Sequence, residues 1–195
     1  GLGTLVFYNY ADLNALGDWF VQLYEESIVE RGAGLNVVSA RGPTSNHSLL
    51  NGIVRGPSDK TVLFVHWRDL GHRLKIPVGT GIKGDLEALE GLTMNQVQTA
   101  SYLGTAEDLT ENLVPHATIE IPQRNAFHLG WLMRTLMDAV AIKGRLQGLH
   151  QDEAGNVNLP DELTYLQHGV EGYKQRTREL ARQMQAVALG SPQGI

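Results

Sequence analysis

The sequence predicts an α/β fold in which a mostly parallel sheet is covered by helices on both faces. Short strand-like runs alternate with helical stretches, and one of those runs, Thr61 to Trp67, is nearly continuous in apolar residues. Alternation of this kind is typical of parallel sheets, and a strand that is buried on both faces has such a continuous apolar run. The predicted strands are residues 4–8, 35–39, 61–67 and 117–121.

The first helices follow from apolar residues spaced three and four positions apart. One helix is expected from Asp12, which would serve as its N-cap, to about Glu30. A shorter helix is expected over residues 45–54. In a fold of this class, ligands bind at the carboxyl ends of the strands, where the strand order reverses.

Three further helical regions complete the expected order of elements. Residues 85–113 are mostly helical in pattern, with a break expected at Gly104. Residues 125–149 are apolar almost all round, so this helix is expected to be central and covered. The C-terminal helical segment, residues 160–190, is assigned to the same domain, with a break expected near Gly169.

Composition restricts the class of protein. Apolar residues make up 42% of the 195 positions and charged residues 19%, which excludes a disordered chain and a coiled-coil rod. A net charge of −5 argues against a nucleic-acid partner, and no apolar run is long enough to span a membrane. The absence of cysteine excludes disulfides and a thiol nucleophile and is compatible with a reducing compartment, so we expect a cytoplasmic protein. The chain opens directly into a strand-like run, which favours a part of a longer protein.

Several short motifs have an ordinary structural explanation. Residues 79–84 match the pattern G-x-G-x-x-G, but the run before them contains Pro77 and a long helical region precedes the next strand. A flexible loop is therefore favoured over a dinucleotide site. The seven histidines lack the spacing of metal ligands, so no metal site is expected. His66 is interpreted as a core histidine at the end of a strand.

The run Leu23 to Ser27 offers a candidate general base. On a helical wheel, Glu26 lies nearer the apolar side, close to Trp19, whereas Glu25 points further out. Partial desolvation at the margin of a core can raise a carboxyl pKa toward the range of a base. Taken alone, a glutamate at such a position is more often an ordinary surface residue.

Two other runs are candidates for ligand binding. Residues 42–48 form a turn followed by a helix start, whose free N–H groups suit an anion or a ligand rich in hydroxyls. In residues 167–174, Lys174 lies beside Val170 and Tyr173 on the wheel, so its stem is expected to run along the core toward a pocket. Taken alone, the first run is an ordinary capped helix, and Lys174 is a solvated helix lysine.

Read in order, these runs resemble the C-terminal half of the glucose-6-phosphate isomerases. That half carries Leu-(Tyr/Trp)-x-Glu-Ser, matched by residues 23–27, and then Gly-x-Thr-Asp-Gln-His-Ser, matched by residues 42–48. A Gly-Pro-x-Asp-Lys turn before a strand is matched by residues 56–60, and Gln-Pro-Gly-Val-Glu-x-x-Lys by residues 167–174. The four motifs occur in the family's order and cover nearly the whole chain.

The resemblance implies a three-layer αβα sandwich of the sugar-isomerase (SIS) type over residues 1–195. It implies interconversion of glucose 6-phosphate and fructose 6-phosphate through an enediol, without metal or organic cofactor. Glu26 would shuttle the proton between C1 and C2, and His47 would assist ring opening from the partner subunit of a homodimer. Lys174 would act at the ring oxygen. The neighbouring residues expected to bind the phosphorylated hexose are Gln167, Thr44 and Ser48.

The chain also departs from the family's pattern. The Gly-Lys pair that usually follows the Glu-Ser run is replaced within residues 28–30, Asp-Gln before the histidine is Ser45-Asn46, and the proline of the last motif is His168. The N-terminal half of the family, with its phosphate-binding loop, has no counterpart here. We therefore expect a domain of a longer two-domain enzyme that has very little activity alone. A non-catalytic phosphosugar-binding or assembly module with the same fold is the alternative.

Overall fold

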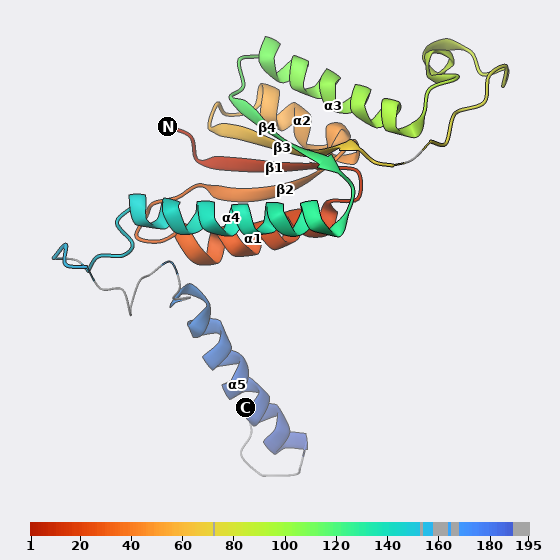
Figure 1. Cartoon of the computed structure of the whole chain (residues 1–195). Coiled ribbons are helices and arrows are strands. Elements are labelled where there is room, and N and C mark those ends of the chain that lie inside the picture. Colours follow the sequence, from red (N-terminus) through yellow and green to blue (C-terminus); the bar gives the residue numbers. More distant parts are fainter. Residues whose placement is uncertain (72, 153, 158–163, 165–167, 189–195) are drawn as a thin grey trace.

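Figure 1 shows the computed structural model of the chain, which describes residues 1–71, 73–152, 154–157, 164 and 168–188. Its sheet has four parallel strands in the order β2-β1-β3-β4, which confirms the predicted class. The strand bounds are β1 (Thr4–Tyr10), β2 (Asn36–Gly42), β3 (Lys60–Asp69) and β4 (His116–Gln123). All four therefore lie where the apolar runs predicted them.

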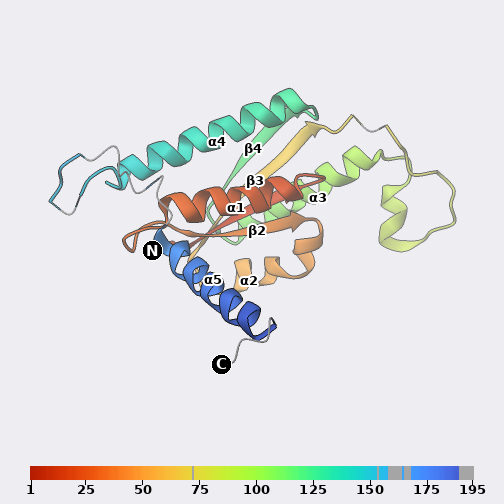
Figure 2. The same ribbon diagram turned by 90° about the horizontal axis from the view of Figure 1, so that it is seen from below.

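Helices cover both faces of the sheet and make a three-layer αβα sandwich (Figures 1 and 2). One layer holds α1 (Asn14–Ile28) and α4 (Ala126–Leu146), which pack side by side. The other layer holds α2 (Leu49–Arg55) and α3 (Met94–Glu111), with the short helix η1 (Thr44–His47) leading into α2. A second short helix, η2 (Gly84–Leu89), lies in the long connection from β3 to α3.

The alternation of side chains along β1 builds a core on each face of the sheet. Phe7 points to the layer of α1 and α4, where its ring stacks on Phe20 of α1 with a centroid distance of 4.2 Å. Tyr8 and Tyr10 point to the other layer and pack against Phe64 and Tyr102. Because successive side chains of a strand point to opposite faces, one central strand supplies aromatic rings to both cores.

The Gly-Pro-x-Asp-Lys turn of residues 56–60 aligns the two central strands. The carbonyl oxygen of Asp59 accepts hydrogen bonds from the backbone N–H groups of Gly3 and Thr4, at 2.7 and 3.0 Å. The ammonium group of Lys60 lies 2.7 Å from the Asp59 carboxylate and closes the turn. The turn therefore sets the register in which β1 and β3 begin to pair.

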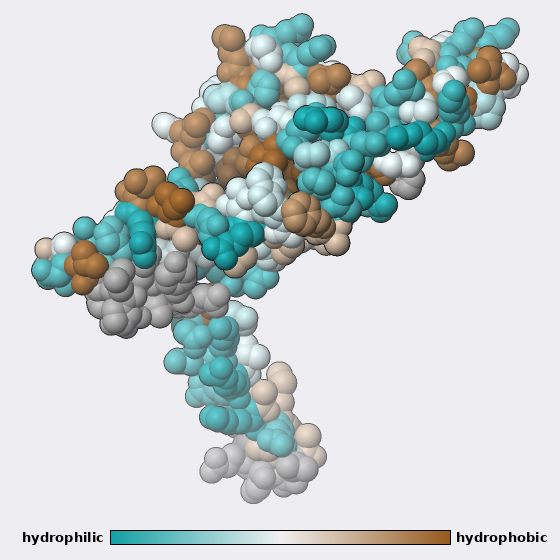
Figure 3. Space-filling model, viewed as in Figure 1, coloured by the Kyte–Doolittle hydropathy of each residue, from teal (hydrophilic) through white to brown (hydrophobic). Residues whose placement is uncertain are grey.

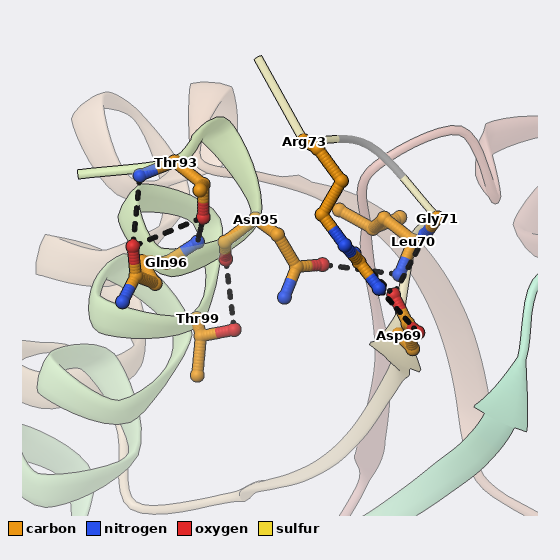
Figure 4. A network of polar contacts seen from close by, with 8 residues as sticks. All are labelled: Asp69, Leu70, Gly71, Arg73, Thr93, Asn95, Gln96 and Thr99. Atoms are coloured by element: carbon orange, nitrogen blue, oxygen red, sulfur yellow. Dashed lines mark hydrogen bonds and ion pairs between the residues drawn. The ribbon is translucent and has the colours of Figure 1, made fainter. Parts of the chain in front are cut away.

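The helical region before β4 differs from its prediction. The break expected at Gly104 is absent, because α3 runs without interruption from Met94 to Glu111. The interruption comes earlier, where Thr93 forms a capping box with Gln96 and starts a new helix (Figure 4). A capping box satisfies two free N–H groups, whereas a glycine in an exposed helix position costs too little to end the helix.

The prediction that α4 is central and covered was wrong. Its inner side is buried through Leu132, Leu136 and Val140, but Phe127 and Trp131 are 75% and 57% exposed. A helix that is apolar all round needs cover on every side. The described residues cover only the side of α4 that faces the sheet and α1.

The last helix, α5 (His168–Ala188), extends away from the sandwich (Figure 1). It continues through Gly169, where a break was expected, and its predicted start near Pro160 lies outside the described residues. Apolar residues recur on one side of α5 and are all exposed, namely Tyr173, Leu180, Met184 and Val187. The core along which Lys174 was expected to lie is therefore not formed by the described residues.

Two glycines on helices test the packing of the sandwich. A Cβ at Gly17 in α1 would lie under 3.0 Å from side-chain atoms of Asn9 and Ser39, whereas a Cβ at Gly104 would meet nothing within 4 Å. We expect Gly17→Ala to lower the free energy of unfolding by about 1–3 kcal/mol, and Gly104→Ala to raise it by about 0.5–1 kcal/mol. Urea unfolding of both variants measures these changes, and an equal effect at the two positions would contradict this packing.

Candidate active site

The crevice at the carboxyl ends of the central strands is filled by protein side chains. The strand order reverses around β1, which places the crevice where ligands bind in folds of this class near Tyr10 and the end of β3. The cavity there has a volume of only about 10 Å³ and is lined by Tyr10, His66, Trp67 and Tyr102, among others. Such a space holds about one water molecule, so a hexose phosphate does not fit in this crevice.

Asp12 ties three strand ends together at this edge and is not the N-cap of α1. The N-cap position is Leu13, with no side-chain capping bond, and the Asp12 carboxylate instead accepts the Trp67 indole N–H at 2.9 Å. Its other oxygen binds the guanidinium of Arg124, just after β4. Burial alone would raise the pKa of Asp12, but the hydrogen bonds from Arg124 and Trp67 outweigh it and lower that pKa.

The turn that carries His47 is anchored through the residue before it. Asn46 Oδ1 accepts the Tyr8 hydroxyl, and Asn46 Nδ2 donates to Thr105 Oγ1 at 2.8 Å. Burial, and secondarily the phenol of Tyr10, raise the pKa of Tyr8, so its hydroxyl keeps its proton and remains a donor. Asn46 therefore positions its neighbour, a role that the sequence did not reveal because Asn46 was interpreted only as a departure from the family's pattern.

The predicted binding groups of this turn are open to solvent. The side chains of Thr44, His47 and Ser48 are accessible at the end of β2. Ser48 donates its backbone N–H to Ser45 O at 3.2 Å. The turn thus offers polar side chains to a ligand or to a partner surface.

Glu26 borders a shallow hollow on the outer side of α1. The hollow has a volume of about 300 Å³ and is lined by Trp19, Gln22, Leu23, Glu26 and Ser27. Glu26 is half-buried, and its expected closeness to Trp19 is confirmed. This space is far larger than the crevice of about 10 Å³ at the strand ends. The candidate base Glu26 therefore borders a hollow that is large enough for a small ligand.

The expectation that Glu25 points away into solvent was wrong. Glu25 is half-buried, and its Oε1 accepts the backbone N–H of Val37 at the start of β2. The wheel could not reveal this contact because the acceptor belongs to one element and the donor to another. Glu25 therefore has a structural role between α1 and β2.

Lys174 lies on α5 and not on the sandwich itself. Its ammonium group is 2.9 Å from Glu171 Oε1, one helical turn earlier. Gln167, the other predicted residue of this motif, lies outside the described residues. The described structure thus places the candidate lysine on a helix whose apolar side is uncovered.

Glu26 and His47 lie on opposite sides of the sheet. Glu26 belongs to the layer of α1 and α4, whereas Asn46 fixes the His47 turn against Thr105 of α3 in the other layer. Figure 1 shows α1 below the sheet and α2, which follows the turn, above it. One copy of the chain does not bring these two side chains to the same place.

His66 is a buried strand-end histidine, as interpreted from the sequence. Its ring stacks on Tyr102 with centroids 4.2 Å apart, and its Nδ1 lies 3.1 Å from the Trp67 carbonyl oxygen. Burial lowers the pKa of His66 despite the Glu120 carboxylate, whose Oε2 is 3.8 Å from Nε2. Its surroundings explain His66 as a core residue.

The loop with the glycine-rich motif connects β3 to α3 and extends away from the sandwich (Figure 1). Figure 4 shows its base, where Asn95 Oδ1 accepts the Leu70 N–H at 3.0 Å and Asp69 pairs with Arg73 at 3.1 Å. The Arg73 guanidinium, followed by the Gly71 N–H, lowers the pKa of Asp69 to about 2. Further out, Glu90 accepts N–H bonds from the motif itself, so the Gly-rich turn binds a carboxylate of its own chain.

Clusters of metal-binding side chains and membrane-spanning helices are absent from the described residues. No group of three or more histidine and carboxylate side chains in the described part of the chain could hold a metal ion. Among the helices of the described ranges, none has the length and apolar character needed to cross a membrane.

Comparison with known proteins gives consistent results over nearly the whole chain. It is 34% identical over 178 residues to glucose-6-phosphate isomerase of Rubrobacter xylanophilus, covering 89% of this chain and 40% of that protein. It is 30% identical over 186 residues to the enzyme of the same name from Symbiobacterium thermophilum, covering 94% and 41%. The chain is related to the glucose-6-phosphate isomerases. No family model matches the chain.

Two solved structures share the fold of this chain. A hypothetical protein of Thermus thermophilus superposes with a TM-score of 0.76 at 30% identity, over 92% of this chain and 41% of that one. A glucose-6-phosphate isomerase of Chlamydia trachomatis has the same fold, with a TM-score of 0.63 at 16% identity over 98% and 36%. The chain spans about two fifths of the length of the curated relatives it matches.

The contacts of Asp12 with Trp67 and Arg124 make the folded state less stable as the pH falls. A carboxyl whose pKa is lower in the folded state stabilises the fold above its unfolded pKa of about 3.9, and this contribution is lost as the pH falls below that value. We expect Asp12→Asn to lower the melting temperature at pH 7 and the difference from the parent protein to shrink below about pH 4. Thermal melts from pH 7 to pH 3 measure this.

The matched control for Asp12 is Asp18→Asn. Asp18 pairs with Arg41 at 3.2 Å on the surface, where both side chains are more than half exposed. An exposed pair of this kind contributes about 0–1 kcal/mol. If Asp18→Asn lowers the melting temperature at pH 7 as much as Asp12→Asn does, the contacts of Asp12 with Trp67 and Arg124 stabilise the fold no more than an exposed ion pair.

Proposed function

We propose that this chain is the C-terminal sugar-isomerase domain of an enzyme that interconverts glucose 6-phosphate and fructose 6-phosphate. The observation that carries the proposal is the Glu26 hollow: the glutamate of the family's Glu-Ser motif borders a space of about 300 Å³. The names of the relatives support the substrate class. Because the chain spans about two fifths of their length, the complete site would include residues from the rest of a longer polypeptide.

The proposed reaction needs one group that takes a proton from one carbon and returns it to the next. A carboxylate does this when it lies within hydrogen-bond reach of both carbons. Glu26 fits this role because its half-buried side chain borders the hollow of about 300 Å³. Glu25 instead lies against the start of β2, where it accepts the Val37 N–H. The ammonium group of Lys174 and the imidazole of His47 would assist ring opening and stabilise negative charge developing on oxygen.

The position of His47 supports a site shared between two subunits. His47 is accessible to solvent and lies on the side of the sheet opposite to Glu26. A residue of this kind reaches the Glu26 hollow from a second copy more readily than from its own. A two-fold arrangement would place both copies in the same relation, giving two equivalent sites. Thr44 and Ser48 of the same turn would contact the phosphorylated substrate.

Substitution of the base tests the reaction. In the complete enzyme, we expect Glu26→Gln to lower kcat by roughly 10²–10⁴, the usual contribution of a positioned base. The change in KM should be small because glutamine keeps the size and much of the hydrogen bonding. Steady-state kinetics in both directions measures this effect.

Glu25→Gln is the matched control for this variant. Glutamine at position 25 keeps an oxygen that can accept the Val37 N–H, so activity should be close to that of the parent enzyme. Loss of activity in Glu25→Gln alone would place the base at position 25, and full activity in both variants would remove the base from this helix.

Mixing of two inactive variants tests the shared site. A dimer of one Glu26→Gln chain and one His47→Ala chain has one intact site, in which Glu26 and His47 come from different subunits. After unfolding and refolding of an equal mixture, we expect about a quarter of the parent activity to return, because half of the dimers are mixed and each has one working site of two. If no activity returns although mixed dimers form, both residues act within one subunit.

A further inference from the structure

The exposed turn with His47 rests on a buried group of polar side chains. Asn46, the residue before His47, reaches inward between Tyr8 of β1 and Thr105 of α3. Tyr8 is fully buried and Thr105 is 4% exposed, whereas His47 lies at the surface. A second tyrosine of β1, Tyr10, is also fully buried and donates to Thr105 Oγ1 at 2.9 Å. We call Tyr8, Tyr10, Asn46 and Thr105 the Asn46 network.

One backbone carbonyl determines the direction of every hydrogen bond in the Asn46 network. Thr105 Oγ1 lies 2.8 Å from the carbonyl oxygen of Ser101, one turn earlier in α3, and a carbonyl oxygen can only accept. The single proton of the Thr105 hydroxyl therefore points to Ser101. Its lone pairs accept from Asn46 Nδ2 at 2.8 Å and from the Tyr10 hydroxyl at 2.9 Å. Because Nδ2 points to Thr105, Asn46 Oδ1 accepts the Tyr8 hydroxyl.

The network requires one donor and one acceptor from the side chain at position 46. A carboxamide supplies both, whereas an aspartate would present two acceptors, one of them to the Thr105 oxygen, whose proton is directed to Ser101. Asparagine is therefore matched to the partners that this chain provides. Since the motif of the isomerase family has glutamine at this position, the resemblance does not imply this arrangement.

The first residue of the turn is fixed by the same strand. Gly42 lies against the ring of Tyr10, and a Cβ at position 42 would lie under 3.0 Å from three carbon atoms of that ring. Tyr10 thus contacts the start of the turn with its ring and supports Asn46 through its hydroxyl on Thr105. The turn is therefore held at both ends by side chains of β1 and α3.

Burial makes these contacts costly to break. If the turn moved outward, Asn46 would leave, and the buried Tyr8 hydroxyl would lose the acceptor to which it donates. A buried donor without a partner costs free energy that a donor at the surface recovers from water. A buried polar network with every member bonded is rigid for this reason. The position of the exposed His47 is thus set by groups that lie inside the sandwich.

We propose that Tyr8, Tyr10 and Thr105 are positioning residues of the proposed isomerase, which act through Asn46 to hold His47 at a fixed place. The inference rests on the proposed function, in which His47 assists ring opening. A group that takes part in such a step has to be placed closely, since a displacement of about 1 Å can cost roughly a hundredfold in rate. A histidine that serves a neighbouring subunit needs this support from its own chain.

Thr105→Val in the complete enzyme tests the proposal. Valine removes the hydroxyl, so Asn46 Nδ2 and the Tyr10 hydroxyl lose the acceptor that they share. We expect kcat to fall by roughly tenfold to a hundredfold, because the turn and His47 are displaced. Thr105→Ser keeps a hydroxyl and should retain kcat to within roughly threefold of the parent enzyme. Steady-state kinetics measures both variants.

Thr99→Val is the matched control. Thr99 also lies on α3, and its hydroxyl donates to the carbonyl oxygen four residues earlier, Asn95 O, at 2.9 Å (Figure 4). Its hydroxyl has no hydrogen bond to the Asn46 network, whose four members all belong to the described residues. Loss of this local bond should change kcat by less than about twofold. An equal loss of kcat in Thr99→Val and Thr105→Val would contradict a specific role of the network.

A double substitution separates positioning from a general effect on the fold. In a His47→Ala background, the turn has no imidazole to position. Thr105→Val should therefore lower kcat by less than about twofold in that background, because residues that act as a unit are not additive. If Thr105→Val lowers kcat as much without His47 as with it, Thr105 acts through some other group, and the proposal is overturned.

Hydrogen exchange of the turn gives a measurement that does not depend on activity. The backbone N–H groups of Asn46 and Ser48 donate to Pro43 O and Ser45 O at 2.9 and 3.2 Å. We expect both amides to exchange at least roughly tenfold faster in Thr105→Val, while the amides of β3 keep their rates, because only the turn opens. Tyr8→Phe retains the ring in the core and should have the same effect, so it replaces Thr105→Val if that variant does not fold.

The two measurements fail separately. Unchanged exchange of the turn in both variants shows that the network does not hold it and overturns the proposal, whatever the kinetics. Faster exchange in the variants of an enzyme that has no isomerase activity refutes the proposed function and supports the network as the support of the turn. Faster exchange with unchanged kcat in an active isomerase shows that the place of His47 does not matter for the reaction, which also overturns the proposal.

Discussion

The central position of β1 determines most of this structure. It pairs with β2 along one edge and with β3 along the other, and the Asp59 carbonyl fixes where the pairing with β3 begins. Since its side chains alternate, Phe7 enters one core while Tyr8 and Tyr10 enter the other. Both cores thus receive side chains from the same seven residues.

The two layers divide the candidate site between them. On one side, Phe7 holds α1 through Phe20 and so places Glu26 on the outer surface of that helix. On the other side, the Tyr8 hydroxyl binds Asn46 and so places His47 at the end of β2. A single strand therefore orients the proposed base and the proposed ring-opening histidine in opposite directions. A shared site in a dimer is one arrangement in which this separation is useful.

Exposed apolar surface is the other general property of the molecule. The sandwich buries two apolar cores, yet α4 and α5 each present an apolar row outward, and the loop after β3 exposes Leu74 and Val78. An isolated domain has no reason to keep such rows, because each costs solubility without adding stability. Figure 3 shows apolar side chains at the surface in the region of α4. In the proposed longer enzyme, the same rows would be available as contacts to the rest of the protein.

The sequence by itself determined the strands, the class of the fold and the candidate residues of the site. This was possible because strand burial and helix periodicity are local patterns, and because four short motifs occur in a recognisable order. It was also sufficient to place His66 in the core. The function of the residues in the motifs rests on the resemblance and stays a prediction.

Only the tertiary structure decided which groups meet. Asp12 has the sequence position of a helix cap, but its carboxylate binds Trp67 in β3 and Arg124 just after β4, both far along the chain. Glu25 has the pattern of a surface residue, but the start of β2 supplies a donor. An apolar helix is expected to be covered, but what covers α4 depends on how many layers the chain can build. Each of these outcomes depends on contacts between different elements of the fold, for which a local pattern carries no information.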